Sequence, residues 1–209
     1  ALDGSRPGRF YINLKSTADN PKWKLPTLMI HEGAPGHHFQ LSAQQLIKGV
    51  PMLRKVLPFS AYAEGWALYA ERVAKVDMGF YDTDPLGDLG RLQAEMFRAV
   101  RLVVDTGMHA KHWSREQAIE YMVAKTGMTE AEVTREIERY VVWPGQATSY
   151  KVGQLAMLRM REEAEKTLGP RFDLRGFHEV ILMNGSMPLA VLEDVVQQWI
   201  KAQQAKPSA

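Results

Sequence analysis

The chain has 209 residues with 26 basic and 24 acidic side chains, a net charge of +2, and a 45% share of hydrophobic residues. This balance gives no polyanion-binding signature, so no nucleic-acid partner is predicted. The absence of cysteine excludes disulfides and thiolate metal ligands. No apolar run approaches the roughly 18 residues of a membrane span. We predict one mainly α-helical lobe over residues 1–209, either cytoplasmic or exported with a signal peptide already lost.

The predicted elements begin with a short strand at Arg9–Asn13, where the pattern alternates. We expect an edge strand that pairs with an extended substrate, or else an arm that packs on the core. Helices are predicted at 25–33, 36–48, 60–77, 85–111, 114–126, 129–142, 146–168, 173–184 and 188–204. Ser60 is the expected cap of the third helix. Two further starts carry capping boxes, Ser114 with Gln117 and Thr129 with Glu132.

The run from His31 to Gln40 reads HEGAPGHHFQ and carries two imidazoles beside a carboxylate. In a zinc hydrolase of the HExxH type, two histidines four residues apart share one helix face, and the intervening glutamate is the base. Here Pro35 occupies the place of the second histidine, so the helix must break or bulge near it. If Pro35 and Gly36 loop out, His37 takes the place of the second ligand.

Two alternatives to this interpretation remain. His38 shares the helix face of His31 if there is no bulge, but its Cα would then lie roughly 10.5 Å further along the axis. The second alternative is a chance cluster, since short motifs of this kind have a real false-positive rate. The sequence therefore favours His37 over His38 without excluding either.

A second segment, EGWALYAE at 64–71, supplies a candidate third ligand. Glu64 lies among small and aromatic residues, and His, His, Glu is a common ligand set of catalytic zinc, with water in the fourth position. Glu71, almost two helical turns later, could orient a ligand imidazole. For both glutamates the alternative is a surface salt bridge.

These residues predict a single zinc held by His31, His37 and Glu64. Zinc lowers the pKa of bound water and polarises a carbonyl, and Glu32 would take the proton of that water and pass it to the leaving group. Tyr150 is a candidate hydroxyl donor to the oxyanion, with His109 as a possible second donor. Both could equally be structural. Further candidates are Arg98, Arg101 and Lys151 for a substrate carboxylate, whereas His112 and His178 are taken as structural.

The chain resembles a bacterial family known as domain of unknown function 885. The family pattern HExxPGHxxQ is matched at His31–Gln40, and its EGWALYAE segment is matched at Glu64–Glu71. Further family-like stretches are RFYIN at 9–13, VDTGMH at 104–109, PGQATSY at 144–150 and FHE at 177–179.

The resemblance implies a helical zincin-like metallopeptidase. We expect a peptide substrate, because the mechanism suits acyl transfer to water and the predicted edge strand suits an extended chain. The resemblance also implies that this chain corresponds to the C-terminal part of a longer protein. We therefore expect the isolated chain to bind zinc but to hydrolyse peptides poorly, and to expose an apolar face for an upstream segment or a second copy. A zinc hydrolase of non-peptide amides or esters, or a non-catalytic interaction fragment, are the alternative functions.

Overall fold

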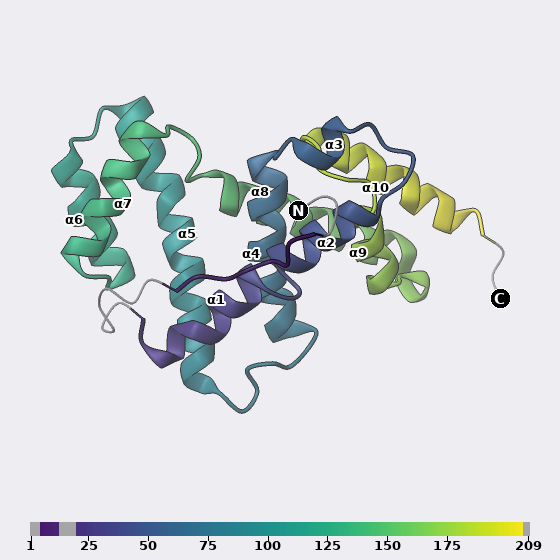
Figure 1. Cartoon of the computed structure of the whole chain (residues 1–209), viewed down its shortest axis with the longest axis horizontal. Coiled ribbons are helices and arrows are strands. Elements are labelled where there is room, and N and C mark those ends of the chain that lie inside the picture. The colour runs from purple at the N-terminus through teal and green to yellow at the C-terminus, as the bar shows by residue number, and fades with distance from the viewer. Residues whose placement is uncertain (1–4, 13–19, 207–209) are drawn as a thin grey trace.

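The computed structural model describes residues 5–12 and 20–206, and this part of the chain is helical (Figure 1). The elements are η2 (Lys22–Lys24), α1 (Leu25–Glu32), α2 (His37–Leu46), α3 (Leu53–Val56), α4 (Ser60–Val76), α5 (Pro85–Lys111), α6 (Arg115–Thr126), α7 (Glu130–Val142), α8 (Ser149–Leu168), η3 (Gly169–Arg171), α9 (Leu174–Leu182) and α10 (Leu189–Gln204).

The predicted helices agree closely with these elements, and the mainly α fold is confirmed. Both predicted capping boxes are formed, at Ser114 and at Thr129. Ser60 is not a cap, because α4 begins at Ser60 itself after Phe59 and has no side-chain cap. The short helix α3 was missed, since four residues are too few to show a helical period.

The predicted edge strand at Arg9–Asn13 is wrong for residues 9–12, which form no strand, while Asn13 lies outside the described residues. A strand needs a partner that completes its ladder of backbone hydrogen bonds, and the described part of the chain contains no strand that could supply one. This segment instead runs past α2, where Gly8 lies against the imidazole of His38. A side chain at position 8 would collide with that ring.

Two large apolar clusters form most of the core, and a small third one consists of Ile30, Ala74 and Tyr81. The first joins α4, α8, α9 and α10 through residues that include Tyr69, Met157, Phe177 and Val196. The second joins α5, α6 and α7 around Met122. In Figure 1 the helices of the second cluster lie on the left and α9 and α10 lie on the right, with α4 and α8 between them.

Helices α4 and α8 cross with their backbones in contact. A Cβ added to Gly65 would meet the Cα of Gly153, and a Cβ added to Gly153 would collide with the carbonyl oxygen of Ala61. Only glycine permits this approach. Because Glu64 precedes Gly65 and Tyr150 lies one turn before Gly153, the crossing fixes the separation of the backbones that carry these two side chains.

An exposed apolar row runs along α5. It consists of Leu89, Leu92, Met96 and Val103, with side chains between 37% and 56% exposed. Such a row is typical of a surface that another protein segment covers. The row agrees with the expected apolar face, and the identity of its partner stays a prediction.

Among the described residues, no helix combines the length and the apolarity that a membrane crossing requires.

Candidate metal centre

The helix that carries His31 ends where Pro35 required an interruption. The N–H of Gly33 donates to the carbonyl of Met29 (2.8 Å), and α1 ends at Glu32. The N–H of Gly36 then reaches back to the carbonyl of Ile30 (3.0 Å), and any side chain at position 36 would collide with the backbone carbonyls of that turn. The chain therefore turns back before α2 begins at His37. The interruption is a break between two helices rather than a bulge within one.

This turn brings three potential ligands together. The Nε2 atom of His31 lies 3.6 Å from Oε2 of Glu64, and Nε2 of His37 lies 3.1 Å from the same oxygen. One donor atom from each residue lies within 4.8 Å of the other two. The exposed His38 lies outside this group. The structure thus brings His31, His37 and Glu64 into one cluster, with its members on α1, α2 and α4.

Each imidazole is held through its other nitrogen. Nδ1 of His31 lies 2.7 Å from Oε1 of Glu71, and Nδ1 of His37 lies 3.3 Å from Oε1 of Gln40. Both Nδ1 atoms face oxygen acceptors, so protonation at Nδ1 would leave both Nε2 atoms, which point to Glu64, to bind a metal. The sequence analysis missed this role of Gln40, although its i, i+3 spacing from His37 was the available signal.

The charges around His31 work in opposite directions. Burial lowers the pKa of His31, but hydrogen bonds to the carboxylates of Glu64 and Glu71 outweigh burial and raise it overall, against the nearby Arg98 guanidinium. Burial likewise raises the pKa of Glu64, but hydrogen bonds to the two histidines hold it well below its usual range. Without a metal, the carboxylates around His31 therefore favour its protonated form.

The donor set fits zinc better than a hard cation. Two imidazole nitrogens and one carboxylate oxygen suit zinc, whereas calcium and magnesium prefer oxygen ligands throughout. Ligands of a tetrahedral zinc at 2.0–2.1 Å stand about 3.4 Å apart. The two distances from Glu64, 3.6 and 3.1 Å, lie on either side of that separation.

The structure places Tyr150 beside this cluster. Its ring stacks on the ring of His31 with 6.2 Å between the two centroids. The central carbon of the Arg101 guanidinium lies over the tyrosine ring, 4.7 Å from the centroid of that ring. The turn before Tyr150 is tied to α5, because both carboxylate oxygens of Asp105 accept from the N–H of Gly145 at 3.1 Å. This contact joins two of the family-like stretches. The aspartate supplies the acceptor, and Gly145 has a φ of +81°, which favours glycine.

The other predicted site residues lie less centrally. His109 is exposed, and its Nδ1 contacts the backbone oxygen of Asp105 (2.9 Å) and its carboxylate (3.3 Å). Its closest partner is thus the residue that holds the turn before Tyr150. Glu32 is the last residue of α1, next to His31, and is partly exposed. His112 ends α5 with a left-handed backbone and is exposed.

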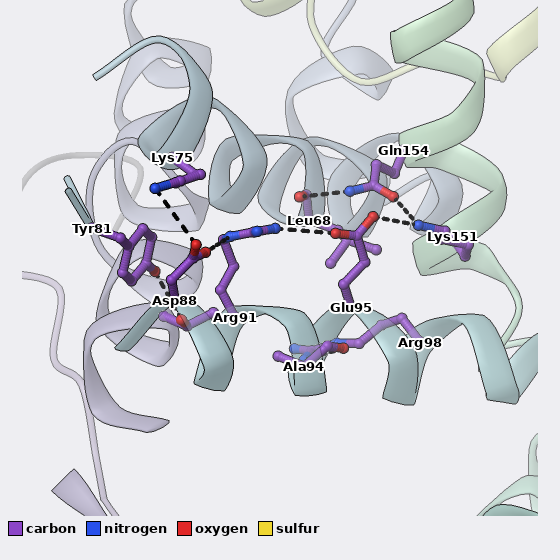
Figure 2. A network of polar contacts seen from close by, with 11 residues as sticks. Leu68, Lys75, Tyr81, Asp88, Arg91, Ala94, Glu95, Arg98, Lys151 and Gln154 are labelled. Atoms are coloured by element: carbon purple, nitrogen blue, oxygen red, sulfur yellow. Dashed lines mark hydrogen bonds and ion pairs between the residues drawn. The ribbon is translucent and has the colours of Figure 1, made fainter. Parts of the chain in front are cut away.

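The three cations predicted to bind a substrate carboxylate already have partners. Arg101 donates to Tyr140 and Glu136, and Lys151 donates to Glu95. Figure 2 shows the network around Lys151, in which Glu95 also accepts from Arg91. Arg98 donates to the backbone of α5 and lies 3.7 Å from Oε1 of Glu71. These cations organise the helices around the cluster.

The family pattern described as "Bacterial protein of unknown function (DUF885)" matches residues 1–196. The chain belongs to this family. The resemblance noted from the sequence is thereby confirmed over nearly the whole chain.

Two solved structures are similar to it. One, described as "the putative lipoprotein from Colwellia psychrerythraea", is 54% identical, with a TM-score of 0.94 over 96% of this chain and 34% of its own. The other, described as "a putative lipoprotein of unknown function from Shewanella oneidensis", is 30% identical, with a TM-score of 0.78 over 84% of this chain and 32% of its own. This chain thus spans about a third of the length of these relatives. No curated protein matches it.

Proposed function

We propose that this DUF885 member is a zinc-dependent hydrolase and that it acts as a metallopeptidase. The observation that carries the proposal is the convergence of His31, His37 and Glu64, whose donor atoms lie within 4.8 Å of one another. Both imidazoles are oriented by a second side chain, which is the usual arrangement at zinc sites. A simple ion pair between Glu64 and the two histidines would not require each Nδ1 atom to contact a further side chain.

In this proposal zinc supplies two effects when bound, a lower pKa for a water molecule and polarisation of the carbonyl under attack. Glu32, next to His31, takes the proton of the attacking water and later gives it to the leaving amine. Tyr150 donates its hydroxyl hydrogen to the developing oxyanion. Because its ring stacks on His31, Tyr150 lies beside the cluster without being one of its ligands.

His109 is the second predicted donor to the oxyanion. Its contacts with Asp105 support a different contribution, which is to hold the turn that precedes Tyr150 through the Asp105–Gly145 contact. A direct role would require His109 to approach the cluster when substrate binds. The two roles predict different kinetics, since a positioning residue tolerates replacement by asparagine better than a proton donor does.

The proposed substrate class is a peptide. The absence of a strand at residues 9–12 removes the expected edge-strand pairing with an extended substrate, so the peptide assignment rests on the chemistry of amide hydrolysis and on the metallopeptidase-like motif. We also propose that the protein is exported, because both solved relatives are described as lipoproteins. The longer relatives contain further residues that could form the opposite wall of a substrate cleft.

Elemental analysis together with hydrolysis assays tests the proposal. The protein should contain one zinc per chain after dialysis, and it should cleave members of a fluorogenic peptide library faster than matched ester and non-peptide amide substrates. The assays should be run on this chain and on the full-length protein. Absence of stoichiometric metal in both would refute the zinc site, whereas zinc with ester hydrolysis alone would refute the peptide substrate.

A further inference from the structure

A large cavity among the described residues lies away from the zinc cluster. It has a volume of about 650 Å³ and lies between α2, α4 and α9. Its apolar walls include Phe39, Ala43, Trp66, Val73 and Leu182. A volume of this size is typical of a small-molecule site, and such sites combine apolar walls with a few placed polar groups.

Helix geometry places this cavity and the zinc cluster on opposite sides of α2 and α4. Phe39 follows His37 by two residues, and Trp66 follows Glu64 by two residues. Two residues correspond to about 200° around a helix. Since Phe39 and Trp66 line the cavity while His37 and Glu64 face each other, the cavity is separate from the cluster. It cannot serve as the substrate pocket of that centre.

One end of the cavity is polar and internally neutralised. Asp77 forms two contacts of 2.7 Å with Arg161, and Arg161 also donates to the hydroxyl of Tyr69 (3.2 Å). That hydroxyl lies 2.8 Å from Nε2 of His178, which lines the cavity. Because a guanidinium can only donate, the hydroxyl accepts from Arg161, and its own hydrogen can then be given to His178.

Burial and this chain of hydrogen bonds bear on the charge of His178 and on which ring nitrogen carries the proton. Burial lowers the pKa of His178 to about 4, so the ring is neutral at neutral pH. With Nε2 accepting from Tyr69, the ring proton is on Nδ1, which is then a donor available to a ligand. The edge of the ring also packs against Trp66, with 5.5 Å between centroids. The cavity therefore combines apolar walls with the neutral imidazole of His178, and the exposed side chains of Arg175 and Glu179 also line it.

We propose that this cavity is a second ligand site, which binds an uncharged molecule that combines a ring-sized apolar group with one hydrogen-bond acceptor. The Phe177-His178-Glu179 stretch, which the proposed zinc chemistry does not use, supplies the donor. The cavity is lined by the carboxylates of Asp77 and Glu179 and by the guanidinium of Arg175, and Asp77 is already paired with Arg161, so the charges are close to balance and give no net preference for an ionic ligand. Binding there does not depend on zinc, because no cluster residue lines the cavity.

The probe Prodan, a neutral naphthalene ketone whose emission shifts to the blue in apolar surroundings, tests this proposal. We expect saturable binding at one site per chain, equally with and without a chelator. The anionic dye 1-anilinonaphthalene-8-sulfonate should bind at least tenfold more weakly. His178→Phe, which keeps an aromatic ring but removes the donor, should weaken Prodan binding several-fold.

A cavity-filling variant and a matched control on the same helix test the position of the site. Ala43→Phe should weaken Prodan binding at least tenfold, whereas Gln45→Phe, on the exposed face of the same helix, should leave it within twofold. If Ala43→Phe fails to fold by circular dichroism, Met183→Trp at the cavity wall replaces it. Unchanged binding in a folded filling variant, or stronger binding of the sulfonate dye, would overturn the proposal. So would a dimer, seen by sedimentation, that excludes Prodan.

Discussion

Oε1 of Glu71 lies 2.7 Å from Nδ1 of His31, and both side chains are almost fully buried. This contact leaves only Nε2 of His31 for the cluster. The same carboxylate oxygen lies 3.7 Å from the Arg98 guanidinium, so Glu71 contacts both His31 and Arg98. Glu71 is therefore the residue on which the orientation of His31 depends most directly.

Replacing Glu71 with glutamine should weaken zinc binding by about tenfold to a hundredfold, because the imidazole loses its charged acceptor while the shape of the side chain is kept. Competition titration against a chromophoric chelator measures the zinc dissociation constant. Glu165→Gln, on the exposed surface of α8, is the control and should bind zinc as the parent does. An unchanged dissociation constant in Glu71→Gln would remove Glu71 from the site.

The choice between the adjacent histidines is tested by two alanine variants. His37→Ala should lose stoichiometric zinc, because it removes a cluster member, and His38→Ala should retain it, because His38 lies against Gly8 instead. Inductively coupled plasma mass spectrometry after dialysis gives the metal content. The reverse pattern would show that the protein rearranges to use His38.

A variant of Glu32 distinguishes zinc binding from the hydrolytic step. Glu32→Gln keeps the size of the side chain but removes the base, so zinc content should stay at one per chain and the hydrolytic rate should fall by at least roughly a hundredfold. The comparison requires the form of the protein in which parent activity is measurable. A rate within a few-fold of the parent would assign the base to another residue.

His178 should make stability depend on pH. Its pKa is lowered to about 4 in the folded protein, mainly by burial, and is near 6.5 when unfolded. Between these values the unfolded chain binds the extra proton, so stability is lost as the pH falls from about 6.5 to about 4. Allowing for partial exposure, the loss is about 2 kcal/mol.

Urea titrations at pH 7 and pH 4.5 measure this dependence. His178→Gln cannot titrate, so its loss of stability over this interval should be smaller than that of the parent by about that amount. His112→Gln, at an exposed position, is the control and should follow the parent. Parallel curves for the parent and His178→Gln would contradict the neutral state of the ring.

The sequence was most informative where the signals were local. Helical periodicity, capping boxes and the Pro35 interruption predicted the helices and the break. The spacing of His31 and His37, together with the small and aromatic residues around Glu64, pointed to the cluster. The role of Gln40 had a local signal in its spacing from His37, whereas the Asp105–Gly145 contact depends on how distant segments pack, which periodicity does not encode. The strand failed for the same reason, because alternation in Arg9–Ile12 says nothing about whether a partner strand exists.

The break at Pro35 also changes what a metal would do for the fold. In an unbroken HExxH helix both histidines belong to one element, so the ion adds little to its shape. Here the three donors come from α1, α2 and α4. An ion at this site would act as a cross-link among three helices, and its binding free energy would count toward the stability of the folded chain.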